Sequence, residues 1–357
     1  MESRKKVVVA CGGTGGHDFP GLAVANVLKE RGHDVTVWLS GRDIESATLK
    51  EWDGPTFSTG AVRLSLHNLP GILRSISTCK REITQAQPDA LLAMGSYSSL
   101  PPVLAARCKK VPILLHEANA IPGKAIDFLS RFATAVAYSF KETPKWLPSI
   151  QTFWTGLPVR TSLAGQSPFD DIPKDVFTFF VTGGSQGAHR VNEILSQAFC
   201  LLREDLPDLP LYVIHQTGKA DEGWVKALYM EHHVQAKVSA FITVMGRAFA
   251  SGDFVVARAG ASTCFELCLV EKPALLIPLP SALRNHQHYN ARALAGIGAV
   301  DDGIQVELTG RSVMRYLRNC MEHPTRLKHM SLALREVARP QAADCVADAL
   351  IEIAGRR

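Results

Sequence analysis

The sequence spells nearly the same turn twice, each time after a short apolar run. Lys6-Val-Val-Val-Ala-Cys11 leads into Gly12-Gly-Thr-Gly-Gly-His17, and Val176-Phe-Thr-Phe-Phe-Val-Thr182 leads into Gly183-Gly-Ser-Gln-Gly-Ala188. Each run predicts a strand, and the pattern after each turn predicts a helix. Because glycine lets the backbone approach a ligand closely, N–H groups of the turn and of the helix N-terminus can converge on an anion. Two copies, one opening each half, indicate two similar domains that face one phosphate-bearing ligand.

Length and composition are those of a globular protein with two domains. The chain has 357 residues, 46% hydrophobic and 20% charged, which is enough for two full cores. Its apolar runs, such as 274–280, are much shorter than the ~20 residues that span a bilayer. The first residues lead straight into a strand, so we expect no signal peptide. Eight cysteines without a CxxC pair predict reduced thiols and a cytoplasmic protein.

Strand-like runs alternate with helical patterns along the whole chain, as in parallel sheets with crossover helices. We expect strands at 7–11, 35–39, 91–93, 113–115 and 135–138, and then at 177–181, 211–215, 238–241, 254–257 and 274–277. The stretch 155–168 is rich in turn-forming residues and lacks periodicity, so it predicts a linker. We therefore expect one domain over 1–160, completed by a last helix at about 340–357, and a second domain over 161–339.

The glycine turns do not match the two commonest nucleotide-binding patterns. GxGxxG would need glycine at Asp18, and after the second strand no acid for a ribose occurs before Asp43. GxxxxGK[ST] is absent, which argues against a P-loop NTPase. Two further glycine turns follow strands, at 95–98 and 257–263. Because open parallel sheets bind ligands at the carboxyl ends of their strands, four such turns predict a nucleotide-sugar site.

The ordered set of segments resembles the lipid I N-acetylglucosaminyltransferases of peptidoglycan synthesis, which are GT-B glycosyltransferases. Besides the two quoted turns, the matching segments are 18–23, 116–119, 156–160, 215–218, 258–261 with Glu266, and 286–287 with 290–291. The resemblance implies an α/β fold of two Rossmann-like, doubly wound parallel-sheet domains facing a deep cleft. It implies an inverting transfer of N-acetylglucosamine from UDP-N-acetylglucosamine (UDP-GlcNAc) to the MurNAc C4 hydroxyl of lipid I, undecaprenyl-pyrophosphoryl-MurNAc-pentapeptide. The product would be lipid II, and neither a metal nor a cofactor would be required.

The resemblance also implies the residues that bind the donor. They are Thr14, Gly15, Gly16, Asn119, Arg160, Ser185, Ile242, Ala261, Ser262, Thr263, Cys264, Phe265, Glu266 and Gln287. The loop of Ser185 would hold the diphosphate, Arg160 would add positive charge, and Glu266 would hold the ribose. Ile242 would present its backbone to uracil. From the residues alone, Ser185 could instead be a helix N-cap, Arg160 a linker salt-bridge partner and Glu266 a first-turn partner of the helix dipole.

An inverting transfer also needs a base near the acceptor hydroxyl. His17, directly after the first turn, is the first choice, because histidine has a usual pKa near ~6.5. His116 and Glu117 are competing candidates, and His17 could instead cap or pack under its loop. In the third turn, Gly95 and Tyr97 are expected to contact the acceptor, although Ser96 stands between them where the family usually has glycine.

Charge and hydropathy in the first half indicate a surface for anionic lipid. Residues 54–81 contain no acid, and their basic residues are Arg63, Arg74, Lys80 and Arg81. One helical stripe within them comprises Leu69, Ile72, Leu73 and Ile76. We expect an interfacial helix that holds the protein peripherally on the cytoplasmic face of the inner membrane. The alternative is an ordinary helix packed on its own sheet.

The expected partners are UDP-GlcNAc, lipid I and an anionic membrane surface, with cell-wall synthesis or division proteins as further candidates and no nucleic acid. Two other functions compete with the transferase. One is another GT-B nucleotide-sugar enzyme, such as a 2-epimerase or a small-molecule transferase. The other is a non-catalytic nucleotide-sugar-binding scaffold. A scaffold would need none of His17, Arg160, Ser185 and Glu266, and the basic, acid-free stretch favours a lipid-linked acceptor.

Overall fold

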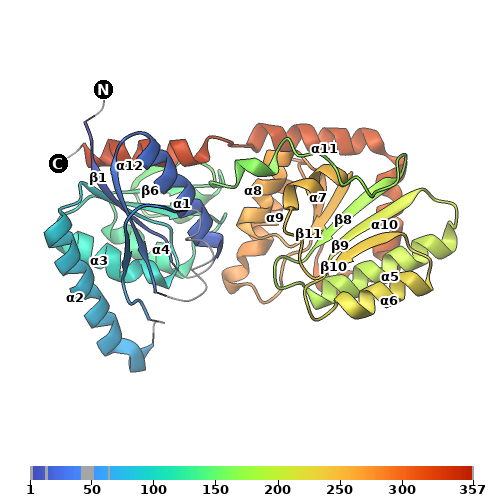
Figure 1. Ribbon diagram of the computed structural model, residues 1–357, viewed down its shortest axis with the longest axis horizontal. Coiled ribbons are helices and arrows are strands. Elements are labelled where there is room, and N and C mark those ends of the chain that lie inside the picture. Colours follow the sequence, from blue (N-terminus) through green and yellow to red (C-terminus); the bar gives the residue numbers. More distant parts are fainter. Residues whose placement is uncertain (1–2, 13–14, 42–51, 63–64, 356–357) are drawn as a thin grey trace. The chain divides into compact units, whose positions relative to one another are not determined.

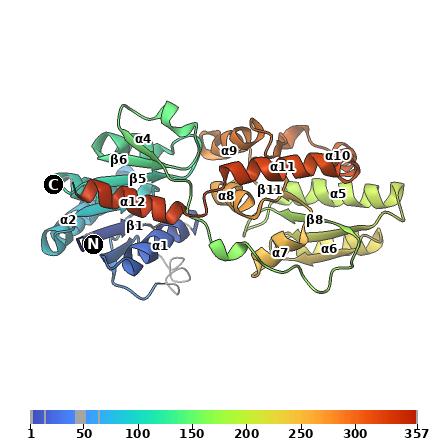
Figure 2. The same ribbon diagram turned by 90° about the horizontal axis from the view of Figure 1, so that it is seen from above.

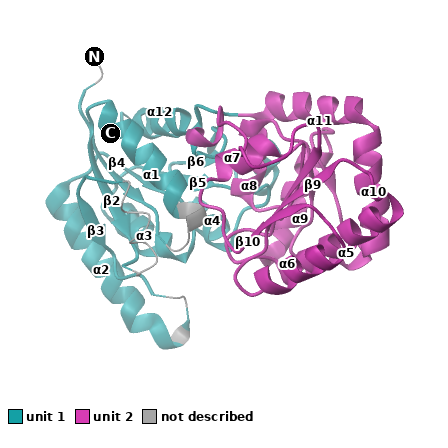
Figure 3. Cartoon of the chain, turned by 45° about the vertical axis from the view of Figure 1, so that its right-hand side comes forward, with its two compact units in different colours: residues 1–160, 339–357 teal, residues 161–338 magenta. Residues whose placement is uncertain are grey.

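The chain folds as two compact units, one of which is assembled from both ends of the sequence. The structure, a computed structural model, describes residues 3–12, 15–41, 52–62 and 65–355, without the side chains of 15–17 and 66. Unit 1 comprises Met1–Arg160 with Arg339–Arg357, and unit 2 comprises Thr161–Ala338 (Figure 3). Each unit contains its own sheet and its own buried core.

Unit 1 is built on a seven-stranded sheet in which all neighbouring strands are parallel (Figure 1). Its strands are β1 (Lys6–Ala10), β2 (Asp34–Leu39), β3 (Thr56–Ser58), β4 (Ala90–Ala93), β5 (Ile113–Glu117), β6 (Ala135–Tyr138) and β7 (Gln151–Trp154). They lie in the order β3-β2-β1-β4-β5-β6-β7, so the chain changes direction across the sheet between β1 and β4. At such a switch point the loops diverge, and ligands bind beside the carboxyl ends of the strands.

Helices cover both faces of the unit 1 sheet. They are α1 (Gly15–Glu30), α2 (Leu69–Ala86), α3 (Leu100–Cys108), α4 (Lys124–Leu129) and α12 (Ala342–Ala354). Successive residues of β1 face opposite ways: Val9 joins the core with α1 and α12, and Val8 joins the core that includes Cys79 of α2. Although α12 follows unit 2 in the sequence, it lies alongside α1 (Figure 2) and buries Val346 and Leu350 in the unit 1 core.

Unit 2 repeats this strand order in a six-stranded parallel sheet, β10-β9-β8-β11-β12-β13. Its strands are β8 (Phe177–Thr182), β9 (Leu211–Gln216), β10 (Ala236–Ser239), β11 (Phe254–Ala257), β12 (Ala274–Leu276) and β13 (Asp301–Asp302). Its helices are α5 (His189–Asp205), α6 (Glu222–Glu231), α7 (Met245–Ser251), α8 (Ala261–Val270), α9 (His286–Ala295), α10 (Gly310–Glu322) and α11 (Pro324–Val337). The switch point of this sheet lies between β8 and β11.

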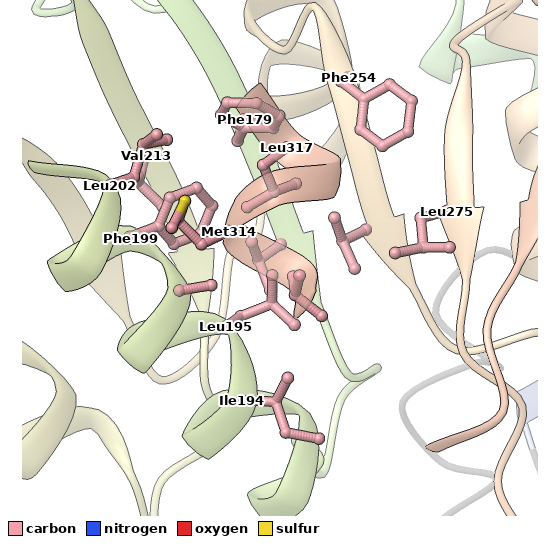
Figure 4. Packing of buried hydrophobic residues seen from close by; sticks show 14 of the residues in the cluster. Phe179, Ile194, Leu195, Phe199, Leu202, Val213, Phe254, Leu275, Met314 and Leu317 are labelled. Atoms are coloured by element: carbon pink, nitrogen blue, oxygen red, sulfur yellow. The ribbon is translucent and has the colours of Figure 1, made fainter. Parts of the chain in front are cut away.

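Aromatic side chains fill the core on one face of the unit 2 sheet. Phe179 of β8 lies between Phe199 of α5 and Phe254 of β11, with ring centroids 5.4 and 6.2 Å away (Figure 4). Leu317 of α10 is buried in the same cluster. This packing holds β8 and α5 rigidly, and the turn that connects them is the second of the two turns quoted from the sequence.

The predicted α/β class is confirmed, and all ten predicted strands are present. The predicted strand 238–241 is wrong in its bounds, because β10 begins and ends two residues earlier, at Ala236–Ser239. Among the described residues, three further strands are not among those predicted from the sequence: β3, β7 and β13. β13 consists of two aspartates, a residue type depleted in strands, and it exists because it pairs with Leu275 and Leu276 of β12. None of the helices in the described part of the chain has the length and apolar character that crossing a membrane requires.

Candidate active site

The glycine turns lie where the strands on either side of each switch point end. In unit 2 the turn 183–188 follows β8, and the turn 258–260 follows β11 and leads into α8. In unit 1, Gly12 follows β1, and the turn 95–98 follows β4. The expectation that these turns share the carboxyl ends of parallel sheets is confirmed for their described residues.

Two glycines shape the turn between β8 and α5. Gly184 and Gly187 have φ angles of +86° and +77°, which glycine adopts without strain. The N–H of Gly187 donates to the Gly184 carbonyl at 3.0 Å, and that of Gly184 donates to Thr182 Oγ1 at 3.2 Å. Ser185 is exposed in this turn, and the N-cap of α5 is Ala188. The alternative that Ser185 caps the helix is therefore wrong.

The turn after β8 is wedged against the exit of β9. A Cβ atom at Gly187 would lie 2.1 Å from the carbonyl oxygen of Thr217. The same carbonyl accepts a hydrogen bond from Asn192 Nδ2 at 2.8 Å, and Asn192 also donates to Asp221 Oδ2 at 2.7 Å. The first turn of α5 thus fixes, through Asn192, the position of the segment that follows β9.

A buried histidine completes this support. His215 Nε2 lies 3.2 Å from Asn192 Oδ1, and its Nδ1 lies 2.9 Å from the hydroxyl of Tyr229. Because an amide oxygen only accepts, Nε2 carries the proton and Nδ1 accepts from Tyr229. Burial lowers the pKa of His215 to about 3. The residue is therefore a neutral structural group rather than a proton acceptor for a substrate.

We expect His215 to make unit 2 sensitive to acid. Its folded pKa lies below the ~6.5 of an exposed imidazole, so the unfolded state takes up the proton first as pH falls. The contribution of His215 to the free energy of unfolding is full above pH ~6.5 and falls by up to about 1.4 kcal/mol per pH unit between there and pH ~3. A His215→Gln variant should melt lower at pH 7 but lose less stability between pH 7 and pH 5. Calorimetric melts, with exposed His329→Gln as the control, measure this, and equal pH slopes in H215Q and wild type would contradict it.

The other turn of unit 2 leads from β11 into α8. Gly260 is the N-cap, and Ala261, Ser262 and Thr263 begin the helix with half-buried side chains. Glu266 is half-buried in the second turn, and the first turn of α8 contains no acid. The alternative that Glu266 is a first-turn dipole partner is therefore wrong.

Two predicted donor-binding residues of α8 have side chains in the protein interior. Cys264 and Phe265 are 0% and 3% exposed. Burial raises the pKa of the Cys264 thiol well above its usual range, so this cysteine is an uncharged core residue. A ligand at this helix start could reach only the backbone of these two residues, whereas Ser262 and Thr263 retain partly accessible side chains.

Polar side chains also fix the segments that follow other strands of unit 2. Gln287, half-buried at the start of α9, accepts from the N–H of Leu279 at 2.9 Å. Ile242 is buried, and its N–H donates to Gln216 Oε1 at 2.8 Å. Gln216 is not among the functional candidates predicted from the sequence, although it stands inside the matching segment 215–218.

His116 and Glu117, at the end of β5, hold the chain in place. The Glu117 carboxylate accepts from the N–H of Asn119 at 2.8 Å, from Asn119 Nδ2 at 3.1 Å and from the N–H of Gly123 at 2.8 Å. Burial raises the pKa of Glu117, and these N–H groups oppose the rise. His116 Nε2 lies 3.0 Å from the carbonyl of Gly156. Both side chains are at most 3% exposed, and these hydrogen bonds give each of them a structural role.

The third turn of unit 1 packs onto the first. The Ser98 hydroxyl donates to the carbonyl of Gly12, and the Ser99 hydroxyl donates to that of Gly95. Ser96 has a φ of +69°, in the region that favours glycine, which explains in physical terms why glycine is the usual residue there. Tyr97 is half-buried at the start of the following 3₁₀ segment.

The first turn itself is only partly described. Thr14 lies outside the described residues, and Gly15, Gly16 and His17 form the first turn of α1, where their side chains are not described. The choice of His17 as base therefore stays a prediction from the sequence. Its position at the start of a helix that follows β1 places its backbone at the carboxyl end of the unit 1 sheet.

Arg160 stacks on an aromatic ring of the same unit. Its guanidinium carbon lies 3.7 Å from the ring centroid of Phe19, which belongs to α1. Arg160 is exposed and forms no ion pair with any of the described residues, so the linker salt bridge is not found there. Stacking fixes the guanidinium plane while its N–H edge stays available to an anion. Phe19 is not among the residues predicted from the sequence, although it lies in the matching segment 18–23.

Comparison with known proteins gives the same picture over the whole chain. The glycosyltransferase family 28 N-terminal domain matches residues 7–138, and the glycosyltransferase family 28 C-terminal domain matches residues 178–346. A curated relative from Geobacter metallireducens is 35% identical over 97% of this chain and 98% of its own length. That relative is named UDP-N-acetylglucosamine–N-acetylmuramyl-(pentapeptide) pyrophosphoryl-undecaprenol N-acetylglucosamine transferase.

Solved structures with the same fold are found. Acinetobacter baumannii MurG is 30% identical with a TM-score of 0.82, and the match covers 97% of this chain and 99% of that one. The UDP-GlcNAc 2-epimerase from Neisseria meningitidis has a TM-score of 0.73, with coverage of 97% and 100%, but at 14% identity it shows the fold alone. With two Rossmann-type units, glycine turns at both switch points and relatives that match from end to end, this chain belongs to glycosyltransferase family 28, in the GT-B fold, and within it to the pyrophosphoryl-undecaprenol N-acetylglucosamine transferases.

Proposed function

We propose that this protein transfers N-acetylglucosamine from UDP-GlcNAc to lipid I, which yields lipid II for peptidoglycan synthesis. The observation that carries the proposal is the similarity to transferases of this name over 97% of the chain. The turns of unit 2 support it, because they offer backbone N–H groups and helix N-termini at one sheet edge, where a diphosphate would be neutralised. The scheme requires no cofactor.

In this scheme unit 2 binds the donor. The turn of Ser185 takes the diphosphate, the carboxylate of Glu266 accepts from the ribose hydroxyls, and the backbone of Ile242 pairs with uracil. Gln287 and, from unit 1, Asn119 contact the sugar. The departing UDP carries the developing negative charge, so pre-oriented N–H groups at the starts of α5 and α8, together with Arg160, lower the barrier by electrostatic stabilisation.

Unit 1 supplies the acceptor side. The C4 hydroxyl of MurNAc attacks C1 of N-acetylglucosamine on the face opposite UDP, and the bond from C1 to the β-phosphate oxygen breaks. The hydroxyl proton passes to His17, and the electron pair of the broken bond leaves with UDP, so the α-linked donor gives a β-linked product. Gly95 and Tyr97, in the turn that packs onto the first turn, are assigned to the lipid I side.

Incubation of the full chain with UDP-GlcNAc and a short-chain lipid I tests the proposal. We expect a disaccharide lipid and one UDP for each disaccharide formed. UDP release without lipid I would favour the 2-epimerase type of reaction. Donor binding without any product, with lipid I present, would favour a non-catalytic scaffold. Either result would contradict the transferase.

We further propose that α2 docks the protein on the cytoplasmic face of the inner membrane. Leu69 and Leu73 of the predicted stripe are 51% and 58% exposed, and Ile72 and Ile76 are half-buried. The buried residues of the helix are Ser75, Cys79 and Ile83, and Ile72 and Ile76 lie on the same side, because each stands seven residues before one of them. Leu69 and Leu73 are therefore the part of the stripe that unit 1 does not cover, and the exposed Arg74 and Arg81 of the same helix favour anionic headgroups.

We expect a Leu69→Asp, Leu73→Asp variant to lose binding to vesicles rich in phosphatidylglycerol. The added charges remove apolar contact and repel anionic lipid, while both positions are too exposed to affect folding strongly. Sedimentation with vesicles measures this. A Thr84→Asp, Gln85→Asp variant, with the same charge change at exposed positions of α2, is the control. Equal binding by the two variants would contradict docking through the stripe.

A further inference from the structure

Gln216 stands at the carboxyl end of β9. The segments that follow the two neighbouring strands belong to the proposed donor site. Gln216 is the last residue of β9, and β9 lies between β8 and β10 in the sheet. The residue is 2% exposed, so its amide must find its hydrogen-bond partners inside the protein. The transfer scheme gives Gln216 no role, although the segment 215–218 is one of those that match the family.

The side-chain amide of Gln216 forms hydrogen bonds with the carboxyl ends of both neighbouring strands and the segments that follow them. Its Nε2 donates to Thr182 Oγ1 at 3.2 Å and to the carbonyl of Gly184 at 3.1 Å. Its Oε1 accepts from the N–H of Ile242 at 2.8 Å. The donor end thus holds the turn after β8, and the acceptor end holds the segment after β10. An apolar side chain at this position could hold neither segment.

The backbone around Gln216 joins the same three exits. The N–H groups of Thr217 and Gly218 donate to the carbonyls of Ser239 and Ala240, both at 3.0 Å, which attaches the β9 exit to the β10 exit. On the other side, Gly187 packs against the Thr217 carbonyl so closely that no Cβ would fit. The segments that follow β8, β9 and β10 are therefore bonded to one another, and the side-chain amide of Gln216 bonds to the first and the third of them.

We infer that Gln216 is a positioning residue that sets the spacing between the diphosphate-binding turn and the uracil-binding segment. The inference rests on the proposed function, which assigns the turn of Gly184 and Ser185 to the diphosphate and Ile242 to uracil. Gln216 acts through Gly184 and Ile242 without touching the donor. UDP, which reaches both segments, benefits from a preset spacing, because neither segment has to be reordered when the ligand binds. Uridine reaches the uracil-binding segment and, through its ribose, Glu266, but it has no diphosphate to contact the turn of Ser185 and does not benefit.

The ratio of the Kd of uridine to the Kd of UDP tests the inference. Both constants are measured on the full chain, UDP by calorimetry and uridine by competition. In a Gln216→Met variant, which keeps the length but removes the amide, we expect this ratio to fall about tenfold. Gln235→Met, at an exposed glutamine just before β10, should leave the ratio unchanged. An unchanged ratio in Q216M overturns the inference, since a merely structural defect weakens both ligands by the same factor.

A milder variant keeps the test valid if Q216M does not fold. Thr182→Val removes one of the three hydrogen-bond partners of Gln216 and places a residue that suits a strand at the end of β8. We expect the ratio of the two Kd values to fall about threefold. A ratio that does not change in T182V, with Q216M unfolded, also overturns the inference. Failure of the proposed function is a separate result: wild-type protein that binds UDP but forms no disaccharide overturns the transferase and leaves the role of Gln216 intact. Wild-type protein that does not bind UDP overturns both.

Discussion

A Gly187→Ala variant is expected to weaken UDP binding by about 100-fold or more. Gly187 has a φ of +77°, where a residue with a Cβ atom loses about 1–2 kcal/mol. The larger effect is steric, because the new methyl group would lie 2.1 Å from the Thr217 carbonyl oxygen and 2.9 Å from Gly218 Cα. Backbone cannot yield as a flexible side chain can, so the turn of Ser185 must move away from the β9 exit. Calorimetric titration with UDP measures the loss.

Gly165→Ala is the matched control for this variant. Gly165 also belongs to unit 2 and has a φ of +71°, but a Cβ there meets no atom within 4 Å. G165A therefore carries the backbone penalty without the collision. We expect its UDP affinity to stay within about threefold of wild type and its melting temperature to fall by less than that of G187A. Equal UDP affinities in G187A and G165A would show that the close contact with Thr217 does not shape the donor site.

A His17→Asn variant is expected to lose about 10²- to 10⁴-fold in kcat while it binds UDP-GlcNAc normally. Asparagine can still form hydrogen bonds but cannot take the proton of the acceptor hydroxyl. The competing candidates have other tasks: Glu117 accepts three N–H bonds, and His116 is bonded to the Gly156 carbonyl. Steady-state kinetics with short-chain lipid I, alongside donor titration, separate the loss of chemistry from the loss of binding.

Two further variants make the assignment of His17 open to refutation. His67→Asn changes an exposed histidine of unit 1 and should keep the wild-type kcat. In Glu117→Gln, the amide NH₂ replaces one of the two oxygens that accept from the N–H groups of Asn119 and Gly123. Because this displaces Asn119, we expect a raised KM for UDP-GlcNAc. If E117Q instead loses kcat at unchanged KM, and H17N stays active, Glu117 is the base and the assignment to His17 is wrong.

The fold could be predicted from the sequence because its signals are local. β-branched and aromatic runs broken by glycines identify β1 and β8, and both turn out to border the switch point of their sheet. The misses have the opposite cause. β13 forms from Asp301 and Asp302 only because β12 offers an unpaired edge, and no property of the two aspartates announces it. Strand pairing of this kind depends on the tertiary structure.

The candidate site could be predicted in its positions more readily than in the roles of its side chains. The segments of Ser185, Ile242 and Glu266 all follow strand exits of unit 2, as the order of elements requires. Sequence reasoning could not tell that Glu117 is saturated by neighbouring N–H groups, because that depends on how the loop after β5 folds back. Gln216 could not be predicted for the same reason. Its amide bonds to residues at or after the ends of β8 and β10, and the sequence does not show that these strands flank β9.

The return of the chain to unit 1 affects the order in which the protein can fold on the ribosome. Residues 1–160 are made first, yet the apolar side of α1 and the face of β4 and β5 beside it stay uncovered until Val346, Leu350 and Ile353 of α12 have emerged. Unit 2 is continuous in sequence and has all its strands by then. The later-made half can therefore complete its core first, and the nascent first half presents an apolar sheet face to chaperones throughout synthesis of the second.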